Sequence, residues 1–267
     1  MENSLNRETI TSQLTTQWLG YPVYYFPEIG STNDHLKELA RVGEPAGAMV
    51  VADFQTSGKG RLDRDWLAPS GTALLFSLLF RPEWPMDRAN WLVMIAGLAT
   101  VEAIKQETGL TAGIKWPNDV VIYQSGQWLK AAGILLETEI IQEALGVAVV
   151  GIGININQGE DDLPKHEANP ISLRMASGQI WSRNYLLVSL LKLFEDRYNK
   201  VIAGESPQTD WNLNLVNIGK QVTVSQIGSD SLIKGLAVGT DERGWLLVED
   251  AAGKIHEVPA GDVTLRG

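Results

Sequence analysis

Apolar runs and helically spaced apolar positions alternate along most of the chain. Continuous apolar runs predict buried strands over Ala48–Phe54, Thr72–Phe80, Trp128–Glu139 and Gly146–Asn155. Apolar positions at helical spacing predict one helix over Asp87–Glu107, stopped by Gly109, and another over Arg183–Ile202, capped by Ser182. The pattern is typical of a mixed α and β fold.

Weaker signals lie before the first buried strand. Tyr21–Phe26 is a short, aromatic-rich strand candidate. Ser31, followed three residues later by Asp34, is a capping-box pattern. We therefore expect a helix that begins near Ser31 and ends by Gly43.

The middle of the chain predicts a hairpin and a long loop. Gly113–Lys115 and Asp119–Tyr123 are strand candidates separated by Trp116-Pro117-Asn118, where the proline has no N–H to donate to a ladder. Asn157–Gln179 lacks clear periodicity and is predicted as a loop, and loops of this length tend to be functional. Pro207–Val216 predicts one more short helix.

The sequence changes character from Gly219 onward. Short strand-like runs cover Gln221–Val224, Leu232–Val238, Trp245–Glu249, Ile255–Val258 and Val263–Leu265. Strands repeated at ~8 to 12 residue spacing indicate a small β-barrel. We place a domain boundary near Leu215, between a domain of residues 1–214 and a domain of residues 215–267.

Composition narrows the function. With 22 Lys and Arg against 32 Asp and Glu, the formal net charge of -10 disfavours general nucleic-acid binding. The chain has no cysteine and only three scattered histidines, so thiol chemistry and a zinc cluster lack raw material. No apolar run is long enough to cross a membrane, and the N-terminal segment lacks a signal-peptide pattern. We expect a cytoplasmic protein.

The loop Gln55–Trp66, QTSGKGRLDRDW, is rich in glycine and positive charge. It lacks the first glycine and the hydroxyl residue of a Walker A loop, and the run Gly151–Ile156 lacks the third glycine of a dinucleotide fingerprint. Its two glycines allow the backbone to approach a ligand, and its lysine and two arginines supply charge. The loop indicates a small anionic ligand; the alternative is a solvated connection whose aspartates offset its cations.

Two further motifs carry candidate chemistry. Lys115-Trp116-Pro117-Asn118-Asp119 could hold Mg²⁺, ribose hydroxyls or a phosphate, or could simply form a capped turn. Lys130 lies within an apolar strand, so it must either extend to solvent or meet an anion. Because no nucleophile elbow or cysteine is present, an enzyme with this sequence would work by orientation and charge stabilisation.

Taken in order, these motifs resemble the biotin protein ligase family. The resemblance rests on Ser31-Thr32-Asn33, Gln55, Gly58–Trp66, Lys115–Asp119, Lys130–Glu137 and Gly151–Asn155. It runs from about Tyr21 to Arg266, nearly the whole chain. It implies an α+β fold in which a mixed β-sheet with flanking helices, of the biotin and lipoate ligase type, is followed by a small SH3-like C-terminal β-barrel.

The resemblance implies an ATP-dependent ligase. The carboxylate of biotin would attack the α-phosphate of ATP to give biotinyl-5′-AMP and pyrophosphate. A lysine ε-amine of the biotin carboxyl carrier protein of acetyl-CoA carboxylase would then attack the mixed anhydride. Mg²⁺ would arrive with ATP, with Asp119 as its candidate ligand, and the family suggests a homodimer formed through the central sheet.

The resemblance also carries over residue by residue. Biotin would be bound by Ser31, Thr32, Asn33, Gln55, Lys59, Gly60, Arg61, Lys130 and Gly133. The nucleotide would be contacted by Lys115, Trp116, Asn118, Asp119 and Asn155. Arg61 and Lys130 would stabilise charge in the first reaction, supported by Lys115, and the Asn157–Gln179 loop would fold over the adenylate as a mobile lid.

Two features depart from the family. Lys59 takes a place often held by arginine and Leu62-Asp63 follows Arg61, which puts loop closure and retention of the adenylate in question. About 20 residues precede the first strand, too few for a winged helix-turn-helix, so no DNA-binding or transcriptional repressor role is expected. The alternatives are a lipoate or octanoyl protein ligase of the same fold and a non-catalytic biotin-binding protein.

Overall fold

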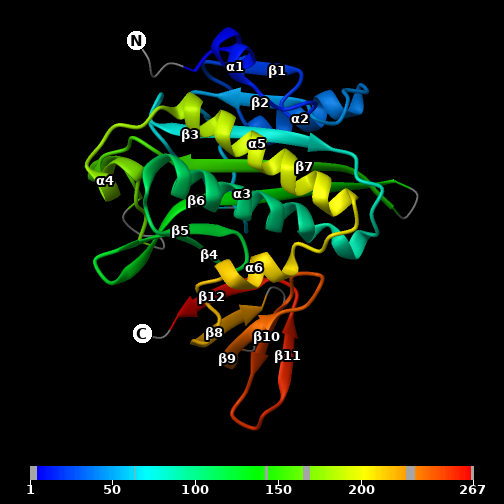
Figure 1. The fold of residues 1–267 in the computed structure, drawn as a ribbon, viewed down its shortest axis with the longest axis vertical. Helices are drawn as coiled ribbons and strands as arrows, with labels where there is room; N and C mark the ends of the chain where they lie inside the picture. Colours follow the sequence, from blue (N-terminus) through cyan, green and yellow to red (C-terminus); the bar gives the residue numbers. More distant parts are fainter. Residues whose placement is uncertain (1–4, 63, 142–143, 165–168, 227–231, 266–267) are drawn as a thin grey trace.

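The computed structural model describes residues 5–62, 64–141, 144–164, 169–226 and 232–265, which form two sheets and several helices (Figure 1). The larger sheet has seven strands in the order β1-β2-β3-β7-β6-β5-β4, and the smaller has five in the order β11-β10-β9-β8-β12. In the larger sheet β1 and β2 pair in parallel, and the other neighbours pair antiparallel. The predicted mixed sheet and separate C-terminal β-structure are confirmed.

The element bounds agree closely with most of the predicted ranges. The larger sheet consists of β1 (Val23–Phe26), β2 (Met49–Ala52), β3 (Ala73–Phe80), β4 (Ala112–Lys115), β5 (Asp119–Gln124), β6 (Gln127–Ile141) and β7 (Ala144–Asn155). The smaller sheet consists of β8 (Gln221–Gln226), β9 (Leu232–Thr240), β10 (Leu246–Glu249), β11 (Ile255–Val258) and β12 (Gly261–Leu265). The helices are α1 (Arg7–Gln13), α2 (Thr32–Arg41), α3 (Asn90–Thr108), α4 (Leu173–Ser177), α5 (Arg183–Ile202), α6 (Gln208–Asn214), and the short 3₁₀ turns η1 (Met86–Arg88) and η2 (Glu160–Asp162).

The predicted capping signals fix the ends of the major helices. The Ser31 side chain accepts a hydrogen bond from the Asp34 backbone N–H at the start of α2. Ser182 does the same for Tyr185 at the start of α5. Gly109 ends α3 in the left-handed region, with φ of 70°. These three boundaries are confirmed because each depends on a local backbone requirement.

Two helices lie where the sequence pattern predicted none. The N-terminal helix α1 is capped by Asn6, whose side chain accepts from the Thr9 backbone N–H, and it buries Ile10 completely. The predicted loop Asn157–Gln179 contains η2 and the helix α4, which Ser172 caps. The loop prediction is therefore wrong for these segments, and residues 165–168 of the predicted lid lie outside the described residues.

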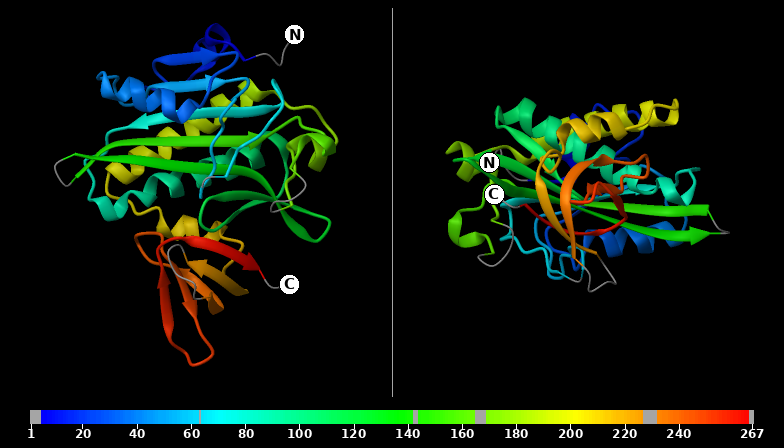
Figure 2. Two further views of the ribbon diagram at one scale, coloured as in Figure 1. Left: turned by 180° about the vertical axis from the view of Figure 1, so that it is seen from behind. Right: turned by 90° about the horizontal axis from the view of Figure 1, so that it is seen from below.

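Helices cover the two faces of the larger sheet unequally. α3 and α5 lie against one face, and α2 lies against the other, where the connection after β2 also descends over the sheet (Figures 1 and 2). Successive side chains of β7 point to opposite faces of the sheet, one toward α3 and the next toward α2. Ile154 joins the core beneath α3, whereas Val147 and Val149 pack with Leu36 of α2.

The smaller sheet is joined to the rest of the molecule by hydrogen bonds from two tryptophans. The Trp116 indole N–H donates to the Gly244 carbonyl at 2.9 Å, and the Trp91 indole N–H donates to the Glu242 carbonyl at 2.6 Å. α6 contacts both α3 and β9. The domain boundary at residue 215 stays a prediction. In the described part of the chain, no helix is long and apolar enough to cross a membrane.

Candidate active site

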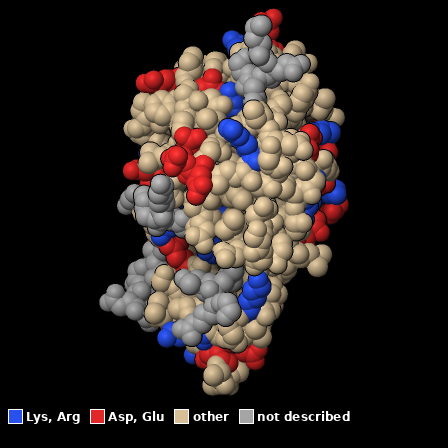
Figure 3. All heavy atoms as spheres, turned by 90° about the vertical axis from the view of Figure 1, so that its left-hand side faces the viewer, with Lys and Arg blue, Asp and Glu red and all other residues tan. Residues whose placement is uncertain are grey.

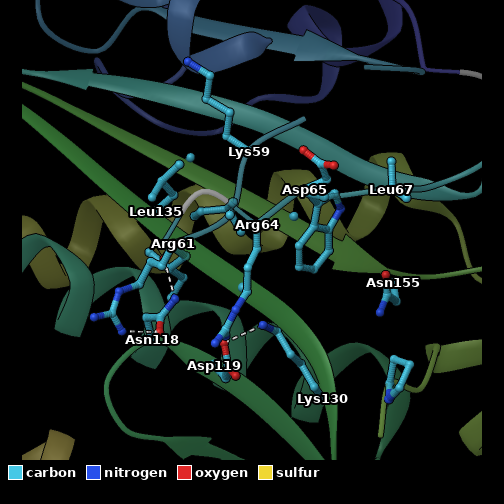
Figure 4. A pocket seen from close by; sticks show the side chains of 18 of the residues that line it. Lys59, Arg61, Arg64, Asp65, Leu67, Asn118, Asp119, Lys130, Leu135 and Asn155 are labelled. Atoms are coloured by element: carbon cyan, nitrogen blue, oxygen red, sulfur yellow. Dashed lines mark hydrogen bonds and ion pairs between the residues drawn. The ribbon is translucent and has the colours of Figure 1, made fainter. Parts of the chain in front are cut away.

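A cavity of about 480 Å³ lies between the larger sheet, the start of α2 and the connection that follows β2 (Figure 4). Every residue predicted to bind biotin or nucleotide lines it. Those residues are Ser31, Thr32, Asn33, Gln55, Lys59, Gly60, Arg61, Lys115, Trp116, Asn118, Asp119, Lys130, Gly133 and Asn155. The structure thus brings together five separate segments of the sequence, while the role of each residue stays a prediction.

Three glycines of β6 and β7 line the floor of this cavity. Gly133 and Gly153 lie opposite each other on β6 and β7, and Gly151 precedes on the same face of β7. A Cβ added at Gly153 would come within 2.5 Å of the Trp66 ring, and one at Gly151 within 2.3 Å of the Asn33 side-chain oxygen. Because side chains on one face of a strand recur every second residue, the missing Cβ atoms at these positions let the Trp66 ring and the Asn33 side chain lie directly against the strand backbone.

Trp66 lies on that floor. Its ring would contact a Cβ at either Gly133 or Gly153, and the Lys130 ammonium lies 5.8 Å from its centroid. The Trp66 indole nitrogen is buried and has no hydrogen-bond partner among the described residues. An acceptor on a bound molecule would satisfy this donor.

One end of the cavity is a buried polar network. Ser31, Thr32 and Asn33 are 5%, 4% and 3% exposed. The Thr32 backbone N–H and hydroxyl both donate to the Gln55 side-chain oxygen, at 2.7 and 2.9 Å. Ser77, which the sequence did not single out, lies 2.5 Å from the Asn33 side-chain oxygen. Fixed donors and acceptors of this kind suit a neutral polar ring system.

Arg61 lies between the larger sheet and the smaller one. Its guanidinium donates to the Asn118 side-chain oxygen at 3.0 Å, and the Asn118 amide donates in turn to the Ile134 carbonyl at 2.8 Å. Burial lowers the pKa of Arg61, and the carboxylates of Asp262 and Asp119 oppose that shift. The group remains a cation at neutral pH and is available to an anion in the cavity.

Lys130 is held from two sides. Its ammonium pairs with the Asp119 carboxylate at 2.8 Å (Figure 4). Its backbone N–H donates to the Asn169 carbonyl at 3.0 Å, and its carbonyl accepts from the Ile171 N–H at 2.8 Å. The described part of the predicted lid after residue 168 is therefore paired with β6 at this lysine, and Lys130 does not extend freely into solvent.

The remaining loop cations pair outside the cavity floor. The Lys59 ammonium lies 2.6 Å from the Asp34 carboxylate, and its side chain is directed away from Arg61 and Lys130 (Figure 4). Arg64 pairs with Asp262 of β12, so the smaller sheet contributes to the rim of the site. The loop backbone closes through hydrogen bonds from Gly60 N–H to Arg64 and from Trp66 N–H to Gly58.

The residues predicted to contact the nucleotide differ in whether their side chains already have partners in the folded chain. The Lys115 side chain makes no hydrogen bond or ion pair with the described residues. The Trp116 indole N–H is already used on Gly244, and the Asn155 side-chain oxygen accepts from Gln158 at 3.0 Å. Lys115 is thus the member of this set best able to meet a phosphate.

The residues present fit Mg²⁺ only as an ion shared with phosphates. In the described residues no group of three His, Asp or Glu is arranged to hold a metal. Asp65, Asp119 and Asp262 line the cavity, and Asp119 also pairs with Lys130. Mg²⁺ commonly binds through one or two carboxylates together with substrate phosphates, which is the arrangement this site permits.

Sequence reasoning did not assign several lining residues. Trp66, Gly151 and Gly153 occur inside the motifs that carried the resemblance, but their common contact depends on the pairing of β6 with β7. Asp262 had no signal, because it comes from the smaller sheet. Leu62 adopts the left-handed region with φ of 58°, and Asp63 lies outside the described residues.

Comparisons with known proteins agree with this geometry. Residues 25–155 match the model of the biotin/lipoate A/B protein ligase family, and residues 218–266 match the biotin protein ligase C terminal domain. The chain is 33% identical over 264 residues to the bifunctional ligase/repressor BirA of Bacillus spizizenii, covering 98% of this chain and 79% of that protein.

Further relatives extend the likeness to solved structures. The biotin–acetyl-CoA-carboxylase ligase of Mycobacterium tuberculosis is 30% identical over 243 residues, covering 88% of this chain and 86% of that one. The biotin protein ligase from Aquifex aeolicus, solved in complex with biotin and ATP, superposes with a TM-score of 0.76 at 30% identity. That match covers 92% of this chain and 99% of the other.

Proposed function

The chain belongs to the biotin protein ligases of the biotin/lipoate A/B protein ligase family, and on that premise we propose a two-step reaction at this cavity. Biotin is activated with ATP to biotinyl-5′-AMP, and the biotinyl group is then transferred to a lysine of the biotin carboxyl carrier protein of acetyl-CoA carboxylase. One observation carries the proposal: a buried polar network and two held cations, Arg61 and Lys130, share one glycine-floored cavity.

In the first step a carboxylate oxygen of biotin attacks the α-phosphorus of ATP, and the bond to the pyrophosphate leaving group breaks. Two anionic groups must approach each other, so positive charge is needed where they meet. Arg61 and Lys130 supply it, and their positions are held by Asn118 and Asp119 before substrate binds. Charge that is already oriented stabilises a transition state without reorganisation at the moment of reaction.

The polar end of the cavity suits the biotin ring. The Thr32, Asn33 and Gln55 groups are connected to one another or to Ser77, so their orientations are fixed in the folded chain. The Trp66 ring, which lies against the backbone at Gly133 and Gly153, offers a flat apolar surface to a bicyclic group and its aliphatic chain. This combination favours biotin over an extended acyl chain such as lipoate.

In the second step a lysine amine of the acceptor attacks the acyl carbon of the mixed anhydride, and AMP leaves. The mixed anhydride is also open to attack by water, so it must be covered until the acceptor arrives. The described residues of the loop Gly58–Trp66, 58–62 and 64–66, lie along the cavity and can exclude water from it. Bound Mg²⁺, held by ATP phosphates and Asp119, would neutralise phosphate charge.

Two further parts of the proposal concern DNA binding and the oligomeric state. The acidic net charge argues against DNA binding, and on the face seen in Figure 3 Lys and Arg are scattered among Asp and Glu instead of forming a basic stripe. A mobility-shift assay that detected specific DNA binding would refute this part. A homodimer is proposed from the family resemblance alone, and sedimentation with and without biotin and ATP tests it.

The reaction itself is tested with biotin, α-labelled ATP and Mg²⁺. We expect a labelled biotinyl-adenylate, and loss of that label as biotin appears on an added carrier domain. An adenylate formed only with lipoate would select the lipoate ligase. Tight binding of biotin with no adenylate at all would identify a binding protein without turnover.

A further inference from the structure

Lys59 occupies a place where arginine is common in the family, and the structure gives this lysine a specific partner. Its ammonium lies 2.6 and 2.7 Å from the two carboxylate oxygens of Asp34, on the first turn of α2. Lys59 lines the cavity, but its side chain points away from Arg61 and Lys130 and reaches Asp34, which is not a lining residue (Figure 4). The contact joins the loop to a rigid helix without occupying the site.

Asp34 is itself fixed by the fold. Lys37, one helical turn further on, lies 2.9 Å from the Asp34 carboxylate and 2.6 Å from the Glu137 carboxylate on β6. Glu137 also accepts a hydrogen bond from the Asn33 amide at 2.8 Å. A chain of alternating charges therefore runs from the sheet, through α2, to the loop. Its members hold Asp34 where Lys59 meets it.

The charge balance supports the pair. Burial raises the pKa of the Asp34 carboxyl, but the hydrogen bonds and charges of Lys59 and Lys37 outweigh it, so the net shift is downward. The carboxylate is therefore ionised throughout the neutral range. Both side chains are more than 40% exposed, so the interaction is screened by salt and its strength is that of a surface ion pair.

The other two cations of the loop have different partners. Arg61 donates to Asn118 in the cavity, and Arg64 reaches the smaller sheet at Asp262. Lys59 is thus an attachment of the other side of the loop to α2. We propose that Asp34 is a positioning residue which, through Lys59, holds the loop Gly58–Trp66 closed and sets how long the adenylate is retained; this inference rests on the proposed function.

Retention is measured by forming biotinyl-adenylate on the enzyme, removing free substrate and following release in the absence of acceptor. Asp34→Asn and Lys59→Met should each speed release about two- to fivefold, the size expected of an exposed ion pair. The double variant should release no faster than either single variant, because both changes break the same contact. Asp34→Glu keeps the charge and should keep release slow.

The matched control is Lys192→Met. Lys192 forms an equally short exposed pair with Asp196 on α5, at 2.6 Å, far from the cavity lining. Its removal should leave adenylate release unchanged. Salt supplies a second readout: release from the wild type should speed up as NaCl rises, whereas release from Asp34→Asn should respond less.

Loop opening can also be measured without any ligand. Trypsin cuts after Arg61 and Arg64 only when the loop opens, so ligand-free Asp34→Asn should be cut there faster than the wild type or Lys192→Met. Unchanged cleavage and unchanged release in Asp34→Asn would overturn the inference, as would additive effects in the double variant. A wild type that forms no adenylate would instead refute the proposed function, while the cleavage result would still decide the role of Asp34.

Discussion

The two faces of β6 and β7 are built from alternate residues of the same strands, but they are filled in opposite ways. On the face beneath α3, Ile134 and Ile154 are almost completely buried in the main core. On the face toward α2, Gly133, Gly151 and Gly153 carry no side chains, so Trp66 and Asn33 lie against the backbone there. One face is filled by close-packed side chains, and the other lines the cavity.

The difference shows how a single strand can serve stability and binding separately. Because neighbouring residues point to opposite faces, a change at one position need not disturb the other face. The cavity lies at the start of α2, where Ser31, Thr32 and Asn33 line it. Substitutions at adjacent positions of β7 can therefore test whether the two faces are independent.

Ile154→Ala should produce the largest effect, and it should be on stability. Ile154 is fully buried beneath α3, so its truncation removes apolar contacts and leaves a cavity. The expected loss in unfolding free energy is about 2 to 5 kcal/mol. Urea denaturation measures it, and a loss below about 1 kcal/mol would show that this face is not close-packed.

Arg61→Ala and Lys130→Ala should act on the reaction and not on the core. If each cation stabilises developing charge, adenylate formation should slow by ~10²-fold or more, equivalent to about 2.7 to 4 kcal/mol. Single-turnover measurement with biotin and α-labelled ATP gives the rate. A variant that forms adenylate at the wild-type rate would remove that residue from the proposed catalytic set.

Gly153→Ala, one residue from Ile154, should impair binding with little change in stability. The added methyl would lie 2.5 Å from the Trp66 ring, so the ring must shift and the floor becomes uneven. We expect KM for biotin to rise by ~10-fold, about 1.4 kcal/mol, which lies within the usual range for overpacking. Similar losses of stability in Gly153→Ala and Ile154→Ala would contradict the separation of the two faces.

Tyr25→Phe should give the smallest effect, at the base of the covering loop. The Tyr25 hydroxyl donates to Asp53 at 2.7 Å, and Asp53 also accepts from the buried Arg183 at 2.6 Å, just before the loop begins. Loss of this bond should lower the unfolding free energy by about 0.5 to 1.5 kcal/mol at pH 7. Denaturation midpoints of the two proteins measure the change.

The same tyrosine predicts a dependence on pH. Burial, followed by the hydrogen bond to Asp53, raises the pKa of Tyr25 to about 12. The folded state therefore favours the neutral phenol, and this stabilisation is complete below the unfolded pKa of about 10. It is lost as pH rises through about 12. Tyr25→Phe should flatten part of the alkaline decline, whereas Tyr123→Phe, on an exposed side chain, should not.

Elements that depend on local signals were predictable from the sequence. Ser31, Ser182 and Gly109 mark helix ends because each satisfies a backbone requirement within a few residues of itself. α1 escaped prediction because its sequence is mostly polar, and its single fully buried residue, Ile10, gives no periodic pattern. α4 is a five-residue helix whose cap, Ser172, is also bonded to Gln158 far along the loop.

The site was predictable as a set of residues but not as an arrangement. The motifs named the lining residues, yet the pairing of Lys59 with Asp34 and of Lys130 with Asp119 depends on how separate elements pack. Lys59 was predicted to close over biotin through its backbone, which stays a prediction, and the contact of its side chain with Asp34 on α2 was not foreseen. Asp262, on β12, could not be foreseen, because nothing local distinguishes it from the other acidic residues of the C-terminal segment.

The main-chain floor constrains how this pocket can change over evolution or in engineering. A glycine can only be replaced by a larger residue, so every mutation at Gly133, Gly151 or Gly153 narrows the space and none enlarges it. Variants that accept bulkier biotin analogues must therefore arise in the loop or on α2. Variants that favour smaller ligands can arise by substitution of any of the three glycines on the sheet.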